Sequence, residues 1–107
     1  MSHDNWVDVL SADALPTDDV IGVEVAGRDI AIYRVGAELY ATDNICTHAE
    51  ARLCDGFLIG HEIECPLHQA RFDVRNGRPT CEPAEEPLRS YPIKVEATRV
   101  WVRIDCD

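Results

Sequence analysis

Short runs of alternating hydrophobic and polar residues, separated by turn-forming residues, cover most of this chain. The alternation has a period of two, which is the period of a β-strand with one buried face. Candidate turns fall at Ala26-Gly27, Gly36-Ala37, Gly60 and Asn76-Gly77. The pattern therefore predicts a domain of short antiparallel strands, with few residues left for helix. The expected strands are residues 6–10, 20–25, 29–35, 38–42, 57–59, 61–65, 71–74, 78–81, 92–97 and 99–104.

The order of these elements predicts an all-β domain with a smaller β subdomain inserted in it. The strands between residues 20 and 42 are expected to form an antiparallel meander, which Asp43-Asn44 ends. Ser11 is suited to cap one helical turn that runs to Leu15. Residues 82–87, rich in proline and glutamate, are predicted to be a loop. We expect one domain over residues 1–107, with the inserted subdomain over about 45–81.

The charge balance narrows the class of partner. The 107 residues include 20 acidic and 10 basic side chains, which gives a net charge of -10. Nucleic acids and anionic membranes attract basic surfaces, so this charge argues against both as partners. It favours docking on a basic protein. The start of the chain shows no basic stretch followed by an apolar run, and no window approaches a membrane span, so we expect neither a targeting segment nor an anchor.

The candidate chemistry lies in Cys46-Thr47-His48 and Cys65-Pro66-Leu67-His68. Each motif puts one thiolate and one imidazole on a loop beyond a strand. Three interpretations compete: core cysteines with chance histidines, a structural zinc site, and a [2Fe–2S] cluster whose second iron is held by two histidines. Paired spacings seldom arise by chance, but counting ligands does not separate zinc from iron and sulfide. The five cysteines are an odd number, and this favours a reducing cytoplasm over a disulfide framework.

The two motifs resemble the ligand boxes of Rieske [2Fe–2S] proteins. The resemblance covers nearly the whole chain and is strongest to the small ferredoxins of multicomponent aromatic-ring dioxygenases, especially the naphthalene-dioxygenase type. Respiratory and photosynthetic Rieske proteins carry an extra, disulfide-forming cysteine in each box and two hydroxyl side chains near the cluster. At the disulfide positions this chain has Ala51 and Leu67, and at the hydroxyl positions Ala70 and Phe72. Further matching segments are Asp43-Asn44, Asp55-Gly56, Arg71-Phe72-Asp73, Asn76-Gly77 and Tyr91-Pro92, whereas Ala49 stands where many relatives have glycine.

The resemblance implies a Rieske-type antiparallel β sandwich that binds one [2Fe–2S] cluster. Cys46 and Cys65 would hold the inner iron, and His48 and His68 would hold the outer iron close to solvent. Histidine ligation raises the reduction potential, and the missing hydroxyl donors lower it again, so we expect a value on the order of -150 mV. An apolar docking rim would consist of Pro66, Leu67, Pro83 and Ala84. Cys54, Cys81 and Cys106 are expected to lie outside the ligand set.

The implied function is electron transport and not catalysis. Neither a nucleophile–base pair nor a glycine-rich phosphate loop is recognisable in the sequence. The chain would pass single electrons from a flavin-containing, NAD(P)H-fed reductase to a terminal oxygenase, as a cytoplasmic monomer. Two alternatives remain open: a Rieske-like small subunit of a larger reductase, such as assimilatory nitrite reductase, and a structural zinc module in an interaction protein.

Overall fold

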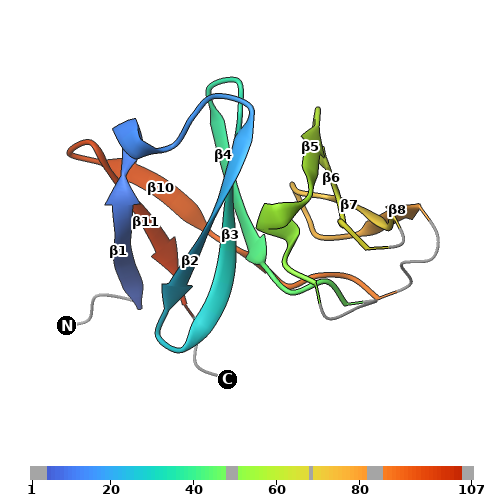
Figure 1. Ribbon diagram of the computed structural model, residues 1–107. Helices are drawn as coiled ribbons and strands as arrows, with labels where there is room; N and C mark the ends of the chain where they lie inside the picture. Colours follow the sequence, from blue (N-terminus) through green and yellow to red (C-terminus); the bar gives the residue numbers. More distant parts are fainter. Residues whose placement is uncertain (1–4, 48–50, 68, 82–85, 105–107) are drawn as a thin grey trace.

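Three antiparallel β-sheets make up the protein, as seen in a computed structural model (Figure 1). The structure describes residues 5–47, 51–67, 69–81 and 86–104. This part of the chain contains eleven strands and two short 3-10 helices. No helix within it has the length and apolar character needed to cross a membrane. The predicted all-β class is confirmed.

The central sheet is the expected meander with one strand added. Its order is β2 (Asp19–Val25), β3 (Arg28–Val35), β4 (Glu38–Asp43) and β9 (Ser90–Tyr91). Ala26 and Gly27 both have positive φ, at 52° and 80°, which is the backbone of the two-residue hairpin turn that the sequence predicted.

The second sheet carries the two ends of the described chain. Its order is β1 (Trp6–Ser11), β11 (Arg99–Arg103) and β10 (Ile93–Glu96). After β1, the 3-10 helix η1 (Ala12–Ala14) forms the predicted turn, and the Asp13 N–H donates to the Ser11 Oγ at 3.3 Å. The predicted closing hairpin is confirmed, and each strand end lies within one residue of that expected.

The third sheet lies on the other side of the central sheet from β1, β10 and β11 (Figure 1). Its order is β5 (Phe57–Ile59), β6 (Glu62–Glu64), β7 (Arg71–Asp73) and β8 (Pro79–Cys81). The 3-10 helix η2 (Leu53–Asp55) precedes β5. The two hairpins predicted around Gly60 and Asn76-Gly77 are therefore present, with strand ends within about two residues of those expected.

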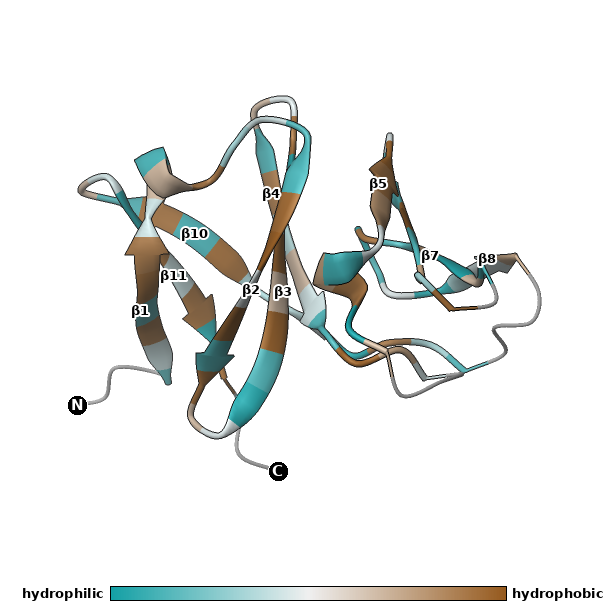
Figure 2. Ribbon diagram, viewed as in Figure 1, coloured by the Kyte–Doolittle hydropathy of each residue, from teal (hydrophilic) through white to brown (hydrophobic). Residues whose placement is uncertain are grey.

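Strand β3 separates two hydrophobic cores because its successive side chains point to opposite faces. Ile30 and Ile32 belong to the core shared with β1, β10 and β11, whereas Ala31 and Tyr33 belong to the core shared with the third sheet. All four side chains are fully buried. In Figure 2, much of β3 has the brown colour of hydrophobic residues, as expected for a strand buried on both faces. The third sheet is thus anchored on the meander through a core that the two share.

Two elements were not predicted from the sequence. Strand β9 has two residues, too few to show a period, and pairs only with Ala41 and Thr42. Helix η2 has no helical pattern; it forms where buried Leu53 packs in the core and the Gly56 N–H donates to the Leu53 carbonyl at 2.9 Å. Of the predicted loop at residues 82–87, positions 82–85 lie outside the described residues.

Candidate metal centre

The two cysteine motifs begin loops of the same length. The Cys46 N–H donates to the Ala51 carbonyl at 2.9 Å, and the Cys65 N–H donates to the Ala70 carbonyl at 2.7 Å. The residues flanking the loops pair as well, Ile45 with Arg52 and Glu64 with Arg71. Each loop therefore spans six residues, is closed at its base in the same way, and starts at its cysteine.

The two cysteine side chains are buried and adjacent. Cys46 is 4% exposed and Cys65 is 1% exposed. The pKa of the Cys65 thiol is raised to about 11, first by burial and then by the hydrogen bond and charge interaction with the Cys46 thiol, while the Leu67 N–H, which donates to the Cys65 sulfur, lowers it. The fold thus brings together two thiols that lie 19 positions apart in the sequence.

The predicted histidine partners, His48 and His68, lie outside the described residues. Within the part of the chain that is described, no group of three or more histidine, cysteine or acidic side chains forms a metal-binding cluster. What is described is one half of the predicted ligand set, namely the two sulfur atoms. Two adjacent thiols become effective ligands when a metal cation offsets the cost of ionising them in a buried place.

A buried asparagine fixes the first loop to the central sheet. The Asn44 side chain is 0% exposed. Its amide nitrogen donates to the Asp29 carboxylate at 2.9 Å and to the Cys54 sulfur at 3.2 Å, and its amide oxygen accepts from the Cys54 N–H at 2.8 Å. The Asn44 carbonyl accepts from the Leu53 N–H at 2.7 Å. Arg52, directly after the loop, forms an ion pair with Asp29 at 3.1 Å.

A glycine allows the second loop to approach helix η2. A Cβ added at Gly56 would lie 2.0 Å from the Glu64 carbonyl oxygen and 3.1 Å from Pro66 Cδ. No side chain fits in that space, so the chain after the first loop can pass this close to the second loop only with glycine at this position. The Asp55-Gly56 segment singled out in the sequence therefore has a steric role between the two loops.

The side chains around the two thiols carry no hydroxyl at the predicted positions. Ala51 and Ala70 end the two loops and are buried, and Phe72 on β7 is fully buried in the same core as both cysteines. Leu67 is 46% exposed in the second loop. The two cysteines therefore belong to an apolar core, and the loop that carries Cys65 reaches the surface at Leu67.

The other cysteines have different surroundings. Cys54 is partly buried and accepts the hydrogen bond from Asn44, while Cys81 is exposed on β8. Neither forms a disulfide. Cys106 and the predicted rim residues Pro83 and Ala84 lie outside the described residues.

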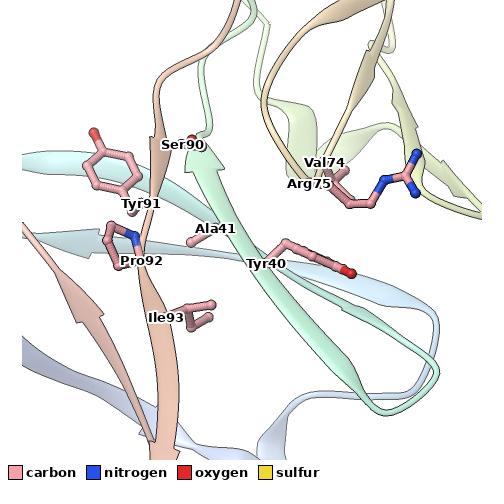
Figure 3. A pocket seen from close by; sticks show the side chains of 8 residues that line it. All are labelled: Tyr40, Ala41, Val74, Arg75, Ser90, Tyr91, Pro92 and Ile93. Atoms are coloured by element: carbon pink, nitrogen blue, oxygen red, sulfur yellow. The ribbon is translucent and has the colours of Figure 1, made fainter.

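A separate pocket of about 420 Å³ lies away from the cysteine loops, against β4, the turn after β7 and the chain from β9 into β10 (Figure 3). Tyr40 and Arg75 lie on one side of β4, and the Tyr91 ring lies on the other side. The Tyr91 hydroxyl accepts from Arg28 at 3.2 Å and donates to Asp43; burial and this second bond raise the pKa of Tyr91. The pocket is lined by Tyr40, Ala41, Val74, Arg75, Ser90, Tyr91, Pro92 and Ile93.

Comparison with known proteins gives one consistent family. Residues 5–92 match the Rieske [2Fe-2S] domain. The chain is 52% identical to the ferredoxin component of the naphthalene 1,2-dioxygenase/salicylate 5-hydroxylase systems of Ralstonia sp, over 94% of this chain and 97% of the relative. It is 50% identical to the ferredoxin component of the naphthalene 1,2-dioxygenase system of Pseudomonas aeruginosa, over 92% of this chain and 95% of that protein.

Comparison with solved structures leads to the same family. The ferredoxin of carbazole 1,9a-dioxygenase from Nocardioides aromaticivorans IC177 superposes with a TM-score of 0.91 at 39% identity, over 94% of this chain and 99% of that chain. A chain in the complex of reduced oxygenase and oxidised ferredoxin in carbazole 1,9a-dioxygenase gives a TM-score of 0.89 at 35% identity, over 94% of each chain. The protein therefore belongs to the Rieske [2Fe–2S] family, among the ferredoxin components of dioxygenase systems.

Proposed function

We propose that this ferredoxin carries single electrons from a flavin-containing, NAD(P)H-fed reductase to the terminal oxygenase of an aromatic-ring dioxygenase system. The observation that carries the proposal is the pair of matched loops, which hold two buried thiols against each other. The relatives are ferredoxin components, which favours the carrier over a reductase subunit or a zinc module. The chain is accordingly an electron-transfer component and not itself an enzyme.

Cys46, His48, Cys65 and His68 are the ligands of one Rieske [2Fe–2S] cluster in this proposal. The two cysteines hold one iron, and the two histidines hold the other. When bound, the cluster takes up and gives back one electron at a time, and its neutral imidazole ligands raise its potential above that of an all-thiolate cluster. The donor set fits this group, because two adjacent buried thiols provide the thiolate pair that one iron needs.

The surrounding residues set the polarity and access of the site. The Leu67 N–H donates to the Cys65 sulfur and so favours its thiolate form. Ala70 and Phe72 offer no hydroxyl to the sulfur atoms, so we expect a potential on the order of -150 mV, the lower end of the Rieske range. Exposed Leu67 and Pro66 keep the second loop at the surface, where a partner protein can approach.

The proposal treats residues 1–107 as one Rieske domain with a cluster-binding subdomain at about 45–81. The separate sheet of β5 to β8 supports this division, since its core is distinct from the one that β1, β10 and β11 share with the meander. We propose a monomer that acts in the cytoplasm, where reducing conditions keep its five cysteines as thiols or ligands.

The first test is an electron paramagnetic resonance spectrum of anaerobically purified protein, before and after dithionite. We expect a silent oxidised sample and an anisotropic reduced signal whose average lies below the free-electron value. Zinc bound without iron or labile sulfide would overturn the cluster assignment. His48→Ala and His68→Ala should each abolish the Rieske spectrum, whereas Cys54→Ser should retain it. Electron delivery is tested by adding the ferredoxin to a reductase and a naphthalene 1,2-dioxygenase oxygenase and following NADH-dependent product formation.

A further inference from the structure

Most of the exposed large hydrophobic side chains belong to the segment that contains the two cysteine loops and strand β5. In the described part of the chain they are Ile45, Phe57, Ile59, Leu67 and Val95, with exposures between 44% and 62%. All except Val95 fall within residues 45–67. Ile45 and Leu67 flank or belong to the two loops themselves, whereas Phe57 and Ile59 lie on strand β5. We call Phe57 and Ile59 the β5 patch.

The β5 patch is one face of an edge strand. Phe57 and Ile59 are 62% and 52% exposed, while Leu58 between them packs against the core of the third sheet. This alternation places both exposed side chains on the same outer face. Figure 2 shows β5 as a hydrophobic strand at the margin of the molecule. Exposed apolar edge strands invite association, and proteins usually protect them with charge or cover.

The patch continues from the loop that carries Cys65. Phe57 pairs with Glu64, the residue directly before Cys65. Gly56, directly before Phe57, packs against the Glu64 carbonyl and lies close to Pro66. Phe57 therefore lies beside the base of the loop on which Pro66 and Leu67 are exposed.

The charges that border the patch are mainly acidic. Glu62 and Glu64 lie opposite Ile59 and Phe57 on β6, and Asp55 is exposed two positions before Phe57. Arg71 is shared by the two glutamates, at 3.1 Å from Glu64 and 3.7 Å from Glu62. These four side chains sum to a charge of -2. The complementary surface is an apolar spot bordered by arginine or lysine.

We propose that the β5 patch is a docking surface for the terminal oxygenase, continuous with the cysteine loops. The inference rests on the function proposed above. A carrier must present its redox centre to both partners in turn, so a contact beyond the loops can distinguish one partner from the other. We assign this contact to the oxygenase, since a related ferredoxin fold occurs in a complex of oxygenase and ferredoxin. Phe57 is its anchor because large aromatic side chains dominate interface energies.

The test compares Phe57→Ser with the wild type in binding to a naphthalene 1,2-dioxygenase oxygenase and, separately, to its reductase. We expect Kd for the oxygenase to rise about tenfold and Kd for the reductase to stay unchanged. Ile59→Ser should act in the same direction and more weakly. Val95→Ser is the matched control: Val95 is 49% exposed on β10, in the sheet remote from β5. It should leave both constants unchanged.

The reduced Rieske spectrum of each variant confirms that the fold and the cluster are intact before binding is compared. An unchanged Kd of Phe57→Ser for the oxygenase would overturn the docking proposal, as would a change confined to the reductase or to self-association. If wild-type ferredoxin delivers electrons but the variants bind normally, only the docking proposal is wrong. If wild-type protein delivers no electrons to the oxygenase, the proposed function itself is wrong, and the docking proposal falls with it.

Discussion

Replacing Asn44 by alanine should destabilise the protein more than any comparable change at the surface. The fully buried Asn44 side chain makes three hydrogen bonds, two donated to the Asp29 carboxylate and the Cys54 sulfur and one accepted from the Cys54 N–H. Alanine removes all three and leaves the Cys54 N–H and one Asp29 oxygen without this partner. The first loop would then lose its side-chain connection through Asn44 to the central sheet.

The size of the effect follows from these contacts. A hydrogen bond to a charged group contributes about 1.5–3 kcal/mol, and a buried donor left without a partner costs about 1–3 kcal/mol. With the weaker hydrogen bond to sulfur added, Asn44→Ala should lower the free energy of unfolding by about 4 kcal/mol. Small domains have only about 5–15 kcal/mol of stability in total. At about 4 °C per kcal/mol for a chain of this size, the unfolding midpoint should fall by about 15 °C.

The measurement is thermal unfolding of the cluster-loaded protein, followed by circular dichroism and visible absorbance at one heating rate. Midpoints are compared and not free energies, since loss of a cofactor makes unfolding depart from two states. Asn76→Ala is the control: Asn76 is exposed, and its side chain accepts one hydrogen bond, from the Arg78 N–H at 2.9 Å. If the two variants had the same midpoint, the role assigned to Asn44 would be wrong.

Three further substitutions test separate features of the site and the core. Gly56→Ala puts a Cβ 2.0 Å from the Glu64 carbonyl oxygen, so it should cost more than about 3 kcal/mol and lower the iron content per purified chain; wild-type iron content would contradict this. Gln69 has a φ of 58°, and in Gln69→Gly the relief of about 1–2 kcal/mol of left-handed strain exceeds the roughly 0.5–1 kcal/mol of chain entropy that glycine costs. The unfolding midpoint should therefore rise by about 2–4 °C; an unchanged midpoint would show that no strain is stored there. Burial raises the pKa of Tyr33 above its ordinary value of 10.0, so the unfolded phenol ionises first and stability falls as pH rises above about 10. Tyr33→Phe should lose less stability over that range, measured by unfolding at several pH values, and an equal loss in both proteins would contradict the assignment.

The strands were predictable because most of them carry their own signal. Residues 20–42 show the period of two and have Gly27 and Gly36 where the hairpins turn. Strand β3 buries both faces, yet its length and its flanking turns still identify it. Strand β9 could not be predicted, since its two residues are held in place by β4 and carry no pattern of their own.

The sequence also located the cysteine motifs, but it did not show how they are held. The spacing of Cys46 and Cys65 identifies two similar loops, whereas the contact between their thiols depends on the packing of the third sheet on the meander. The sequence identifies Asp43-Asn44 as the end of the meander and as a segment that matches the family, and neither observation predicts a buried side chain at Asn44. From the sequence alone, a buried asparagine with three hydrogen-bond partners cannot be distinguished from an exposed asparagine in a turn. The structure is needed to tell the two apart.

The fold therefore holds the two cysteines in an arrangement that favours cluster binding. Each loop closes through a local hydrogen bond at its own base, so its shape depends little on the other loop. Their relative placement depends on Asn44, which ties the first loop to β3, and on Gly56, which lets the second loop come close. Since the two thiols are already adjacent, binding need not bring the two cysteines together, and the change at the cysteines themselves is the loss of two thiol protons. Substitutions at Asn44 and Gly56 should thus weaken cluster retention more than side-chain substitutions at Leu67, whose side chain is 46% exposed.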